Sequence, residues 1–91
     1  MDYEWDENKR MSNLKKHGLD FADARMVFED INSILIFDDR QDYGEERFRT
    51  IGKNKKELLT AVIHTDRNKK TRIISFRLAT KLERRLYYGN S

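Results

Sequence analysis

The sequence contains no cysteine and no proline, and its longest unbroken apolar run is the four residues from Ile34 to Phe37. Without cysteine, the chain forms no disulfide, has no thiolate nucleophile and does not bind zinc through sulfur. A transmembrane helix takes about 20 apolar residues, so no segment is long enough to cross a bilayer. The acidic, polar opening MDYEWDENKR does not resemble a signal peptide. We therefore expect a cytoplasmic protein that has no membrane segment.

The chain is small and highly charged, and we expect one domain over residues 1–91. Residues 1–46 contain 6 Lys or Arg and 13 Asp or Glu, a net charge of −7, whereas residues 47–91 contain 13 and 3, a net charge of +10. A strongly basic half indicates an anionic partner such as a nucleic acid. The alternative is that the two halves face each other and partly neutralise their charges.

The first third of the chain predicts a short strand and two helices. A strand at residues 3–5 precedes Asp6, whose carboxylate caps a helix by accepting the free N–H groups of the first turn. That helix ends at Gly18, which adopts the left-handed conformation readily. Asp20 caps a second helix, on which Phe21, Ala24, Val27 and Phe28 share one face.

The remainder predicts strands and a final helix. NSILIFDD, RFRTIG, ELLTAVIHT and TRIISFR are rich in β-branched and aromatic residues, and the polar turn DRNKK joins the last two. Thr80 and Glu83 form a capping box for a helix over residues 79–88. The order of elements predicts an α+β fold, in which two N-terminal helices pack on a small antiparallel β-sheet and a short C-terminal helix follows.

His64 and Glu46 are candidates for proton transfer. With the hairpin turn centred on Asn68, His64 would lie opposite Arg72, whose charge would lower the pKa of the imidazole toward that of a general base. A lone histidine in a strand is more often a hydrogen-bonded structural residue. Glu45 and Glu46 precede Arg47 at the start of a strand, and a carboxylate there could transfer protons or pair with an arginine.

Basic side chains gather at the C-terminal end of the chain. Arg77 leaves the last strand where strand ends commonly open onto a cleft, and in a regular strand Arg72 would lie on the opposite face from it. On the final helix, cations and a tyrosine recur three or four residues apart at Lys81, Arg84, Arg85 and Tyr88. Such a stripe fits phosphate gripping and base stacking, although runs of charge are commonly only a solvated face.

Lys16 and His17 stand in the last turn of the first predicted helix, where cations interact favourably with the helix dipole. A structural role therefore explains His17. The two histidines have neither HxH nor HxxxH spacing, so we expect no metal site and no cofactor.

Cleavage of RNA is one of the few reactions that such residues can perform. The 2′-hydroxyl of the substrate is the nucleophile, so the protein has to supply a base, an acid and fixed positive charge around the phosphate. Charge of this kind is often the largest contribution to catalysis. Arginines beside a core strand are held rigidly enough to supply it.

Four blocks of the sequence together resemble one family. YEWDENKRMSNLKKHGLDFADARMVFED, GEERFRTIG, VIHTDR and RIISFRLATKLERRLY are similar, in this order, to the blocks of the BrnT family of bacterial toxins. The resemblance implies a RelE-like fold and a metal-independent endoribonuclease that inhibits translation and growth. It also implies a cognate antitoxin, BrnA, with a ribbon-helix-helix region, in a complex of two toxins and two antitoxins that represses its own operon. Operator DNA would be bound only through the antitoxin.

The resemblance also implies site residues. Arg77, Arg72, His64 and Glu46 are the expected catalytic residues. The expected RNA-binding residues are Lys16, Arg47 and Tyr87, together with Lys81 and Arg84 from the basic stripe on the final helix. Phe76 departs from the family pattern, which more often has a small residue there, and its ring could narrow a pocket beside Arg77. The alternative function is a non-catalytic module that binds nucleic acid or the antitoxin through the same basic face.

Overall fold

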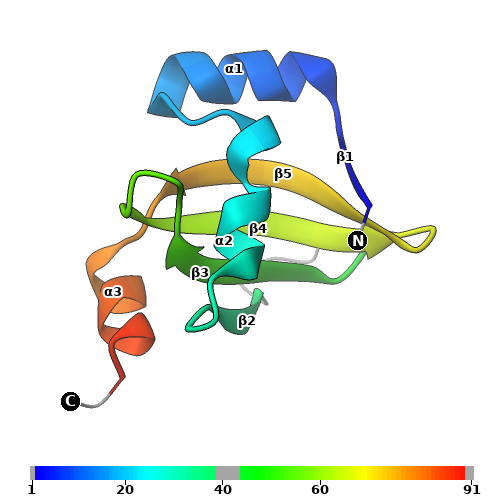
Figure 1. Cartoon of the computed structure of the whole chain (residues 1–91). Coiled ribbons are helices and arrows are strands. Elements are labelled where there is room, and N and C mark those ends of the chain that lie inside the picture. Colours follow the sequence, from blue (N-terminus) through cyan, green and yellow to red (C-terminus); the bar gives the residue numbers. More distant parts are fainter. Residues whose placement is uncertain (1, 39–43, 90–91) are drawn as a thin grey trace.

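The computed structural model describes residues 2–38 and 44–89, which form a sheet flanked by helices (Figure 1). The elements in chain order are β1 (Tyr3–Trp5), α1 (Glu7–His17), the 3-10 turn η1 (Phe21–Asp23), α2 (Arg25–Glu29), β2 (Ile34–Asp38), β3 (Arg47–Lys53), β4 (Leu59–Arg67), β5 (Lys70–Leu78) and α3 (Lys81–Tyr87). Within the described ranges the five strands form one sheet in the order β1-β5-β4-β3-β2. The α+β class is confirmed. The sheet is only mostly antiparallel, because β1 pairs with β5 in parallel.

Local capping signals set the ends of α1 as the sequence predicts. The Asp6 carboxylate accepts hydrogen bonds from the backbone N–H groups of Asn8 and Lys9. At the other end Gly18 has a φ of 72° and donates its N–H to the carbonyl of Leu14 at 2.8 Å. Hydrogen bonds therefore cap α1 at both ends.

The prediction of two N-terminal helices is confirmed only for the first. Asp20 caps the next segment by accepting from the N–H of Ala22, but that segment is a 3-10 turn followed by the five-residue helix α2. Phe21, Ala24 and Val27 are all buried there. Because residues three apart eclipse each other in 3-10 geometry, the tight turn places Phe21 and Ala24 on one face, and Val27 follows three residues later on α2.

Hydrophobic residues pack on both faces of the sheet. On one face, called the helix face, a core of Val62, Ile73 and Phe76 packs against residues of η1 and α2. On the opposite face, called the α3 face, Ile51, Ala61 and Ile63 are buried, with Ala79 and Tyr87 from the C-terminal end of the chain packed against them. Figure 1 shows α1 and α2 on the first face and α3 at one end of the sheet.

Two contacts bring the helices close to β3. A Cβ atom on Gly52 would lie 2.9 Å from the carbonyl oxygen of Val27, so glycine allows α2 to approach the strand. The hydroxyl of Tyr87 donates to Asp30 Oδ2 at 2.7 Å, and the N–H of Lys53 donates to the same oxygen at 2.9 Å. Asp30 thereby connects the ends of α2 and α3 to the sheet.

The hairpin between β4 and β5 differs from the prediction by one residue. Asn68 and Lys69 have φ values of 53° and 65°, as a two-residue type I′ turn requires, and the turn is centred between them rather than on Asn68. His64 therefore pairs with Ile73, and Arg72 pairs with Thr65. Since neighbouring residues of a strand point to opposite faces, His64 and Arg72 lie on opposite faces of the sheet.

Candidate functional site

Four arginines from β3 and β5 lie on the α3 face: Arg47, Arg49, Arg72 and Arg77. Together they are called the arginine face. On β3, two of them alternate with Ile51, which is buried on the same side of the sheet. The side chains of Arg49, Arg77 and Arg72 are only 15, 21 and 28% exposed. These guanidinium groups are therefore held in place by the fold.

A β-bulge brings Arg72 and Arg77 to the same face. In a regular strand, residues five apart point in opposite directions, which is the arrangement that the sequence predicts. In β5 the register shifts by one residue, because Ile63 pairs with Ser75 whereas His64 pairs with Ile73. Ile74 is the extra residue, and it packs on the α3 face. The prediction that the two arginines are on opposite faces is therefore wrong.

Glu83 is the centre of a group of hydrogen bonds on this face. Its side chain is fully buried and accepts from Arg77 Nη1 at 2.7 Å, from Arg77 Nη2 at 3.0 Å and from Arg49 Nη1 at 2.6 Å. It also accepts from the N–H of Thr80 at 2.8 Å, which completes the predicted capping box. Burial alone would raise the pKa of Glu83, but the hydrogen bonds from Arg77 and Thr80 outweigh it and lower the pKa to about 2.

The other end of the arginine face is more open. Arg72 Nη1 donates to Glu4 Oε2 on β1 at 3.0 Å, and this pair is about a quarter exposed on each side. Glu45 pairs with Arg67 at 3.0 Å. The hydrogen bond from Arg67 lowers the pKa of Glu45, and the charges of Arg47 and Arg72 lower it further. The charges of Arg47 and Arg72 thus act on the Glu45 carboxylate.

His64 is separated from all of these groups. It lies on the helix face with 6% exposure, and its ring packs against Phe28 and Phe48 at centroid distances of 4.9 and 5.9 Å. Its Nε2 lies 2.8 Å from Thr50 Oγ1. Burial lowers its pKa to about 4, so the cause is desolvation and not a neighbouring arginine. The geometry matches the structural interpretation of this histidine.

Comparison with known proteins identifies the family. The family model described as the ribonuclease toxin BrnT of type II toxin–antitoxin systems matches residues 5–83. The chain belongs to the BrnT family. Its structure is similar to the crystal structure of the Brucella abortus ribonuclease toxin BrnT, with 34% sequence identity and a TM-score of 0.70. The match covers 89% of this chain and 99% of that one. No curated protein sequence matches the chain significantly.

Membership of the BrnT family makes this chain a ribonuclease toxin, and it implies an RNA substrate and an antitoxin partner. The fold is that of BrnT, whereas the expected likeness to RelE stays a prediction. Among the described helices, none is both long and apolar enough to span a membrane. In residues 2–38 and 44–89, no three His, Asp or Glu side chains are grouped closely enough to hold a metal ion.

The predicted RNA-binding residues are spread over three parts of the molecule. Arg47 belongs to the arginine face, whereas Lys16 is exposed at the end of α1. Lys81 and Arg84 are exposed on α3 and line a shallow hollow of about 290 Å³ together with Tyr88. The hydroxyl of Tyr87 is instead occupied by Asp30, and burial followed by this bond raises its pKa to about 12.

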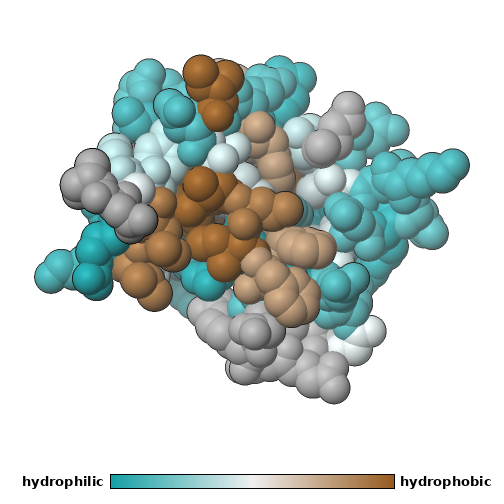
Figure 2. All heavy atoms as spheres, turned by 90° about the horizontal axis from the view of Figure 1, so that it is seen from below, coloured by the Kyte–Doolittle hydropathy of each residue, from teal (hydrophilic) through white to brown (hydrophobic). Residues whose placement is uncertain are grey.

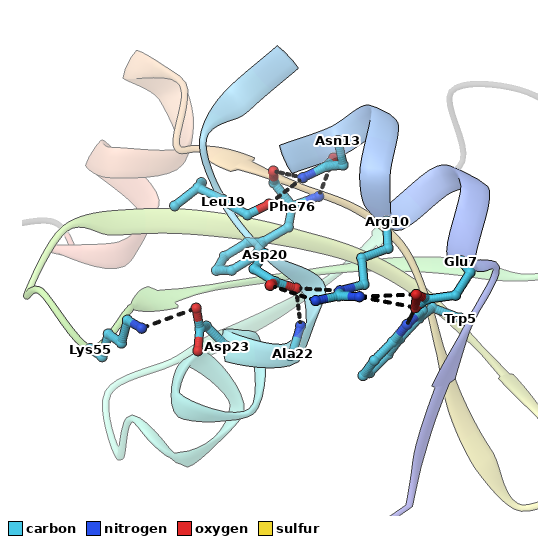
Figure 3. Close-up of polar contacts among 10 residues, drawn as sticks. All are labelled: Trp5, Glu7, Arg10, Asn13, Leu19, Asp20, Ala22, Asp23, Lys55 and Phe76. Carbon is cyan, nitrogen blue, oxygen red and sulfur yellow. Dashed lines mark hydrogen bonds and ion pairs between the residues drawn. The ribbon is translucent and has the colours of Figure 1, made fainter. Parts of the chain in front are cut away.

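Several polar residues near the start of the chain hold the fold together (Figure 3). Asn13 Nδ2 donates to the carbonyls of Leu19 and Phe76, and Asn13 Oδ1 accepts from the N–H of Phe76 at 3.1 Å. Arg10 forms a two-point ion pair with Asp20 and also contacts Glu7. This part of the BrnT block therefore fixes α1 to β5 and to the following turn.

Phe76 does not narrow a pocket beside Arg77. It is fully buried in the core of the helix face, on the other side of β5 from the arginine face. The expectation about its ring is therefore wrong, because adjacent residues of a strand point to opposite faces.

The sequence interpretation considered Glu45 but chose Glu46, and it missed Arg49 and the second role of Glu83. A signal for Arg49 was present, because Glu45, Arg47 and Arg49 alternate at the two-residue period of a strand. Glu46 is the odd member of that series, and it is exposed with its backbone carbonyl bonded to Thr65. Glu83 was interpreted only as a helix cap, since no local pattern relates it to an arginine on β3.

Proposed function

We propose that this BrnT protein is a metal-independent endoribonuclease whose active site is the arginine face. The observation that supports this most is the convergence of four arginines from β3 and β5 on one side of the sheet, with three of them at most 28% exposed. Fixed guanidinium groups are suited to stabilising the charge that develops on a phosphate in the transition state.

In the proposed reaction, the 2′-oxygen of the RNA forms a bond to the adjacent phosphorus, and the bond from phosphorus to the 5′-oxygen breaks. Arg72 uses one of its five N–H donors in the hydrogen bond to Glu4, so its other donors can bind phosphate oxygens. Arg77 supplies positive charge from a position fixed by Glu83. Both roles agree with the sequence prediction.

A carboxylate takes the proton of the 2′-hydroxyl, and the carboxylic acid so formed gives a proton to the leaving 5′-oxygen, which regenerates the carboxylate. Glu46 and His64 are the predicted groups for these transfers. We favour Glu45 over both, because the charges of Arg47 and Arg72 act on its carboxylate and because His64 lies on the helix face. Lys16, Lys81 and Arg84 then extend the contact to flanking phosphates.

Cleavage by matched arginine variants tests the proposal. The toxin is freed of its antitoxin, kept in a chelator and incubated with labelled RNA. We expect Arg72→Gln to cut about 100-fold more slowly than wild type, as removal of one transition-state donor does. Arg25→Gln is the control, because Arg25 is 66% exposed on α2. RNA with 2′-O-methyl groups should stay intact.

The outcomes separate the enzyme from a binding module. Equal cleavage by the two variants would contradict the assignment of the arginine face. A shift of intact RNA that weakens steeply with salt would instead favour the non-catalytic alternative. Arg77→Ala is a poor first variant, because it leaves the buried Glu83 without its main partner.

The cellular role follows from the same proposal. In the cytoplasm, cleavage of RNA lowers translation and stops growth until the antitoxin binds. We expect a BrnA-like antitoxin with a ribbon-helix-helix region, two copies of each chain in the complex, and repression of the operon through DNA contacts made by the antitoxin.

A further inference from the structure

Among the described residues, strand β2 forms an outer edge of the sheet, and it carries exposed apolar side chains. Leu35 is 64% and Phe37 52% exposed, and these two residues are called the β2 patch. Seen from below, where β2 lies in Figure 1, the molecule shows one continuous apolar area (Figure 2). Such an area on a small soluble protein indicates a surface that another chain covers.

The two edges of the sheet are protected to different degrees. The other edge strand, β1, has only three residues, and its Glu4 is paired with Arg72. Strand β2 has five residues, ILIFD, with no lysine and no proline. Its single charged residue, Asp38, is buried. Since natural sheets normally protect a free edge by one of these means, the β2 edge is suited to pair with an added strand.

A hollow beside the β2 patch could receive a side chain from that strand. It has a volume of about 280 Å³ and lies between α2 and β2, where Phe28, Leu35, Thr50 and His64 line it. The rings of Phe37 and Phe48 stand 5.9 Å apart on the same face of the sheet. An apolar side chain of a partner would therefore meet apolar surface on this side.

On the opposite side of the sheet, β2 itself presents Ile34, Ile36 and Asp38, and the basic residues lie one strand further in. Arg47 and Arg49 belong to β3, the strand next to β2, and they point to the α3 face. A strand added outside β2 would lie about 10 Å from β3, which is two strand spacings. Long acidic side chains on that strand would reach toward the two guanidinium groups. Two copies of this chain paired through β2 would instead bring arginines of like charge toward each other.

We propose that an extended segment of the antitoxin pairs with β2 as a sixth strand. Its apolar residues cover the β2 patch, and the residues that alternate with them are acidic and face the arginine face. This inference rests on the proposed function, because it explains how antitoxin binding at an edge blocks the RNA site.

The affinity of toxin variants for the antitoxin of the same pair tests the docking site. The complex is co-expressed and separated, and binding is measured by calorimetry for wild type, Phe37→Glu, Leu35→Glu and the control Met11→Glu. Met11 is 58% exposed on α1, away from β2. We expect binding to weaken about 10- to 100-fold for each β2 variant, as for the loss of a buried large apolar side chain, and not for the control. Hydrogen exchange should show slower exchange at residues 34–38 in the complex.

RNA cleavage by the β2 variants without antitoxin should equal that of wild type. Wild-type affinity of both variants, or unchanged exchange at residues 34–38, would overturn the docking inference. A free toxin that is a dimer in sedimentation, becomes monomeric on Phe37→Glu and still binds antitoxin would assign the edge to a second copy, and so overturn it too. If wild type cuts no RNA but the β2 variants still lose antitoxin, the proposed function fails and the docking site stands.

Discussion

Replacing Glu83 by glutamine tests whether the ion pairs around this residue stabilise the fold. Glutamine keeps the shape of the side chain and one oxygen, but it removes the charge that faces Arg49 and Arg77. Lowering the pKa from 4.5 to about 2 corresponds to about 3 kcal/mol at 1.36 kcal/mol per unit. Removing one partner of a buried ion pair independently costs about 3–5 kcal/mol. We therefore expect Glu83→Gln to lose about 3 kcal/mol of unfolding free energy.

Urea unfolding followed by the fluorescence of Trp5 and by circular dichroism measures this loss. With a typical dependence on urea for a small domain, the midpoint should fall by roughly 2 M. The control is Glu29→Gln, because Glu29 is 57% exposed and its pair with Arg25 is 3.6 Å long, so a change below about 0.5 kcal/mol is expected. A loss below about 1 kcal/mol for Glu83→Gln would refute the reasoning.

The difference in unfolding free energy between wild type and Glu83→Gln, measured at several pH values, checks that the charge of Glu83 causes the loss. Because the folded state lowers the pKa of Glu83, its contribution is fully present above about pH 4.5 and is lost as the pH falls through about 2. The difference between wild type and Glu83→Gln should thus be constant from pH 7 to 5 and shrink below 4.5. A difference that persists at pH 2 would mean that packing, and not charge, explains the loss.

Three further variants test other contacts by the same unfolding assay. Asn13→Ala should lose about 3 kcal/mol, since it leaves the buried N–H and carbonyl of Phe76 without a partner, and a loss under 1 kcal/mol would contradict this. Tyr87→Phe should lose about 1.5 kcal/mol, because its hydroxyl no longer bonds the Asp30 carboxylate, whereas unchanged stability would show that this bond contributes nothing. The lowered pKa of His64 means that its folded form resists protonation, so wild type should lose up to about 3 kcal/mol as the pH falls from 6.5 to 4, and His64→Gln should lack this loss. An equal slope in both proteins would contradict the burial of a neutral imidazole.

The local signals of the sequence predicted the parts of the fold that depend on local chemistry. Asp6, Gly18 and the pair of Thr80 and Glu83 act within a few residues of themselves, and each was confirmed. The second helix was only partly right, because its apolar residues recur at an interval of three as well as four. That pattern fits a 3-10 turn as well as an α-helix.

The arrangement of the site depends on register, which local patterns do not determine. Arg72 and Arg77 were expected to diverge, and His64 was expected to face Arg72, because the hairpin was treated as regular and centred on one residue. The type I′ turn and the extra residue at Ile74 reverse both expectations. Glu83 joins the cluster through Arg49, which lies 34 residues earlier in the chain.

Because of the bulge at Ile74, Arg72 and Arg77 lie on the same face of the sheet although they are an odd number of residues apart. An odd separation along the chain acts as an even one in space, because one residue is absorbed without a pairing partner. Deleting Ile74 would restore regular pairing between β4 and β5. One of the two arginine side chains would then lie on the helix face, although every functional side chain would still be present. Substitution scanning cannot detect a dependence of this kind. Changes of chain length can, so a deletion in β5 is as informative about this face as any replacement of an arginine.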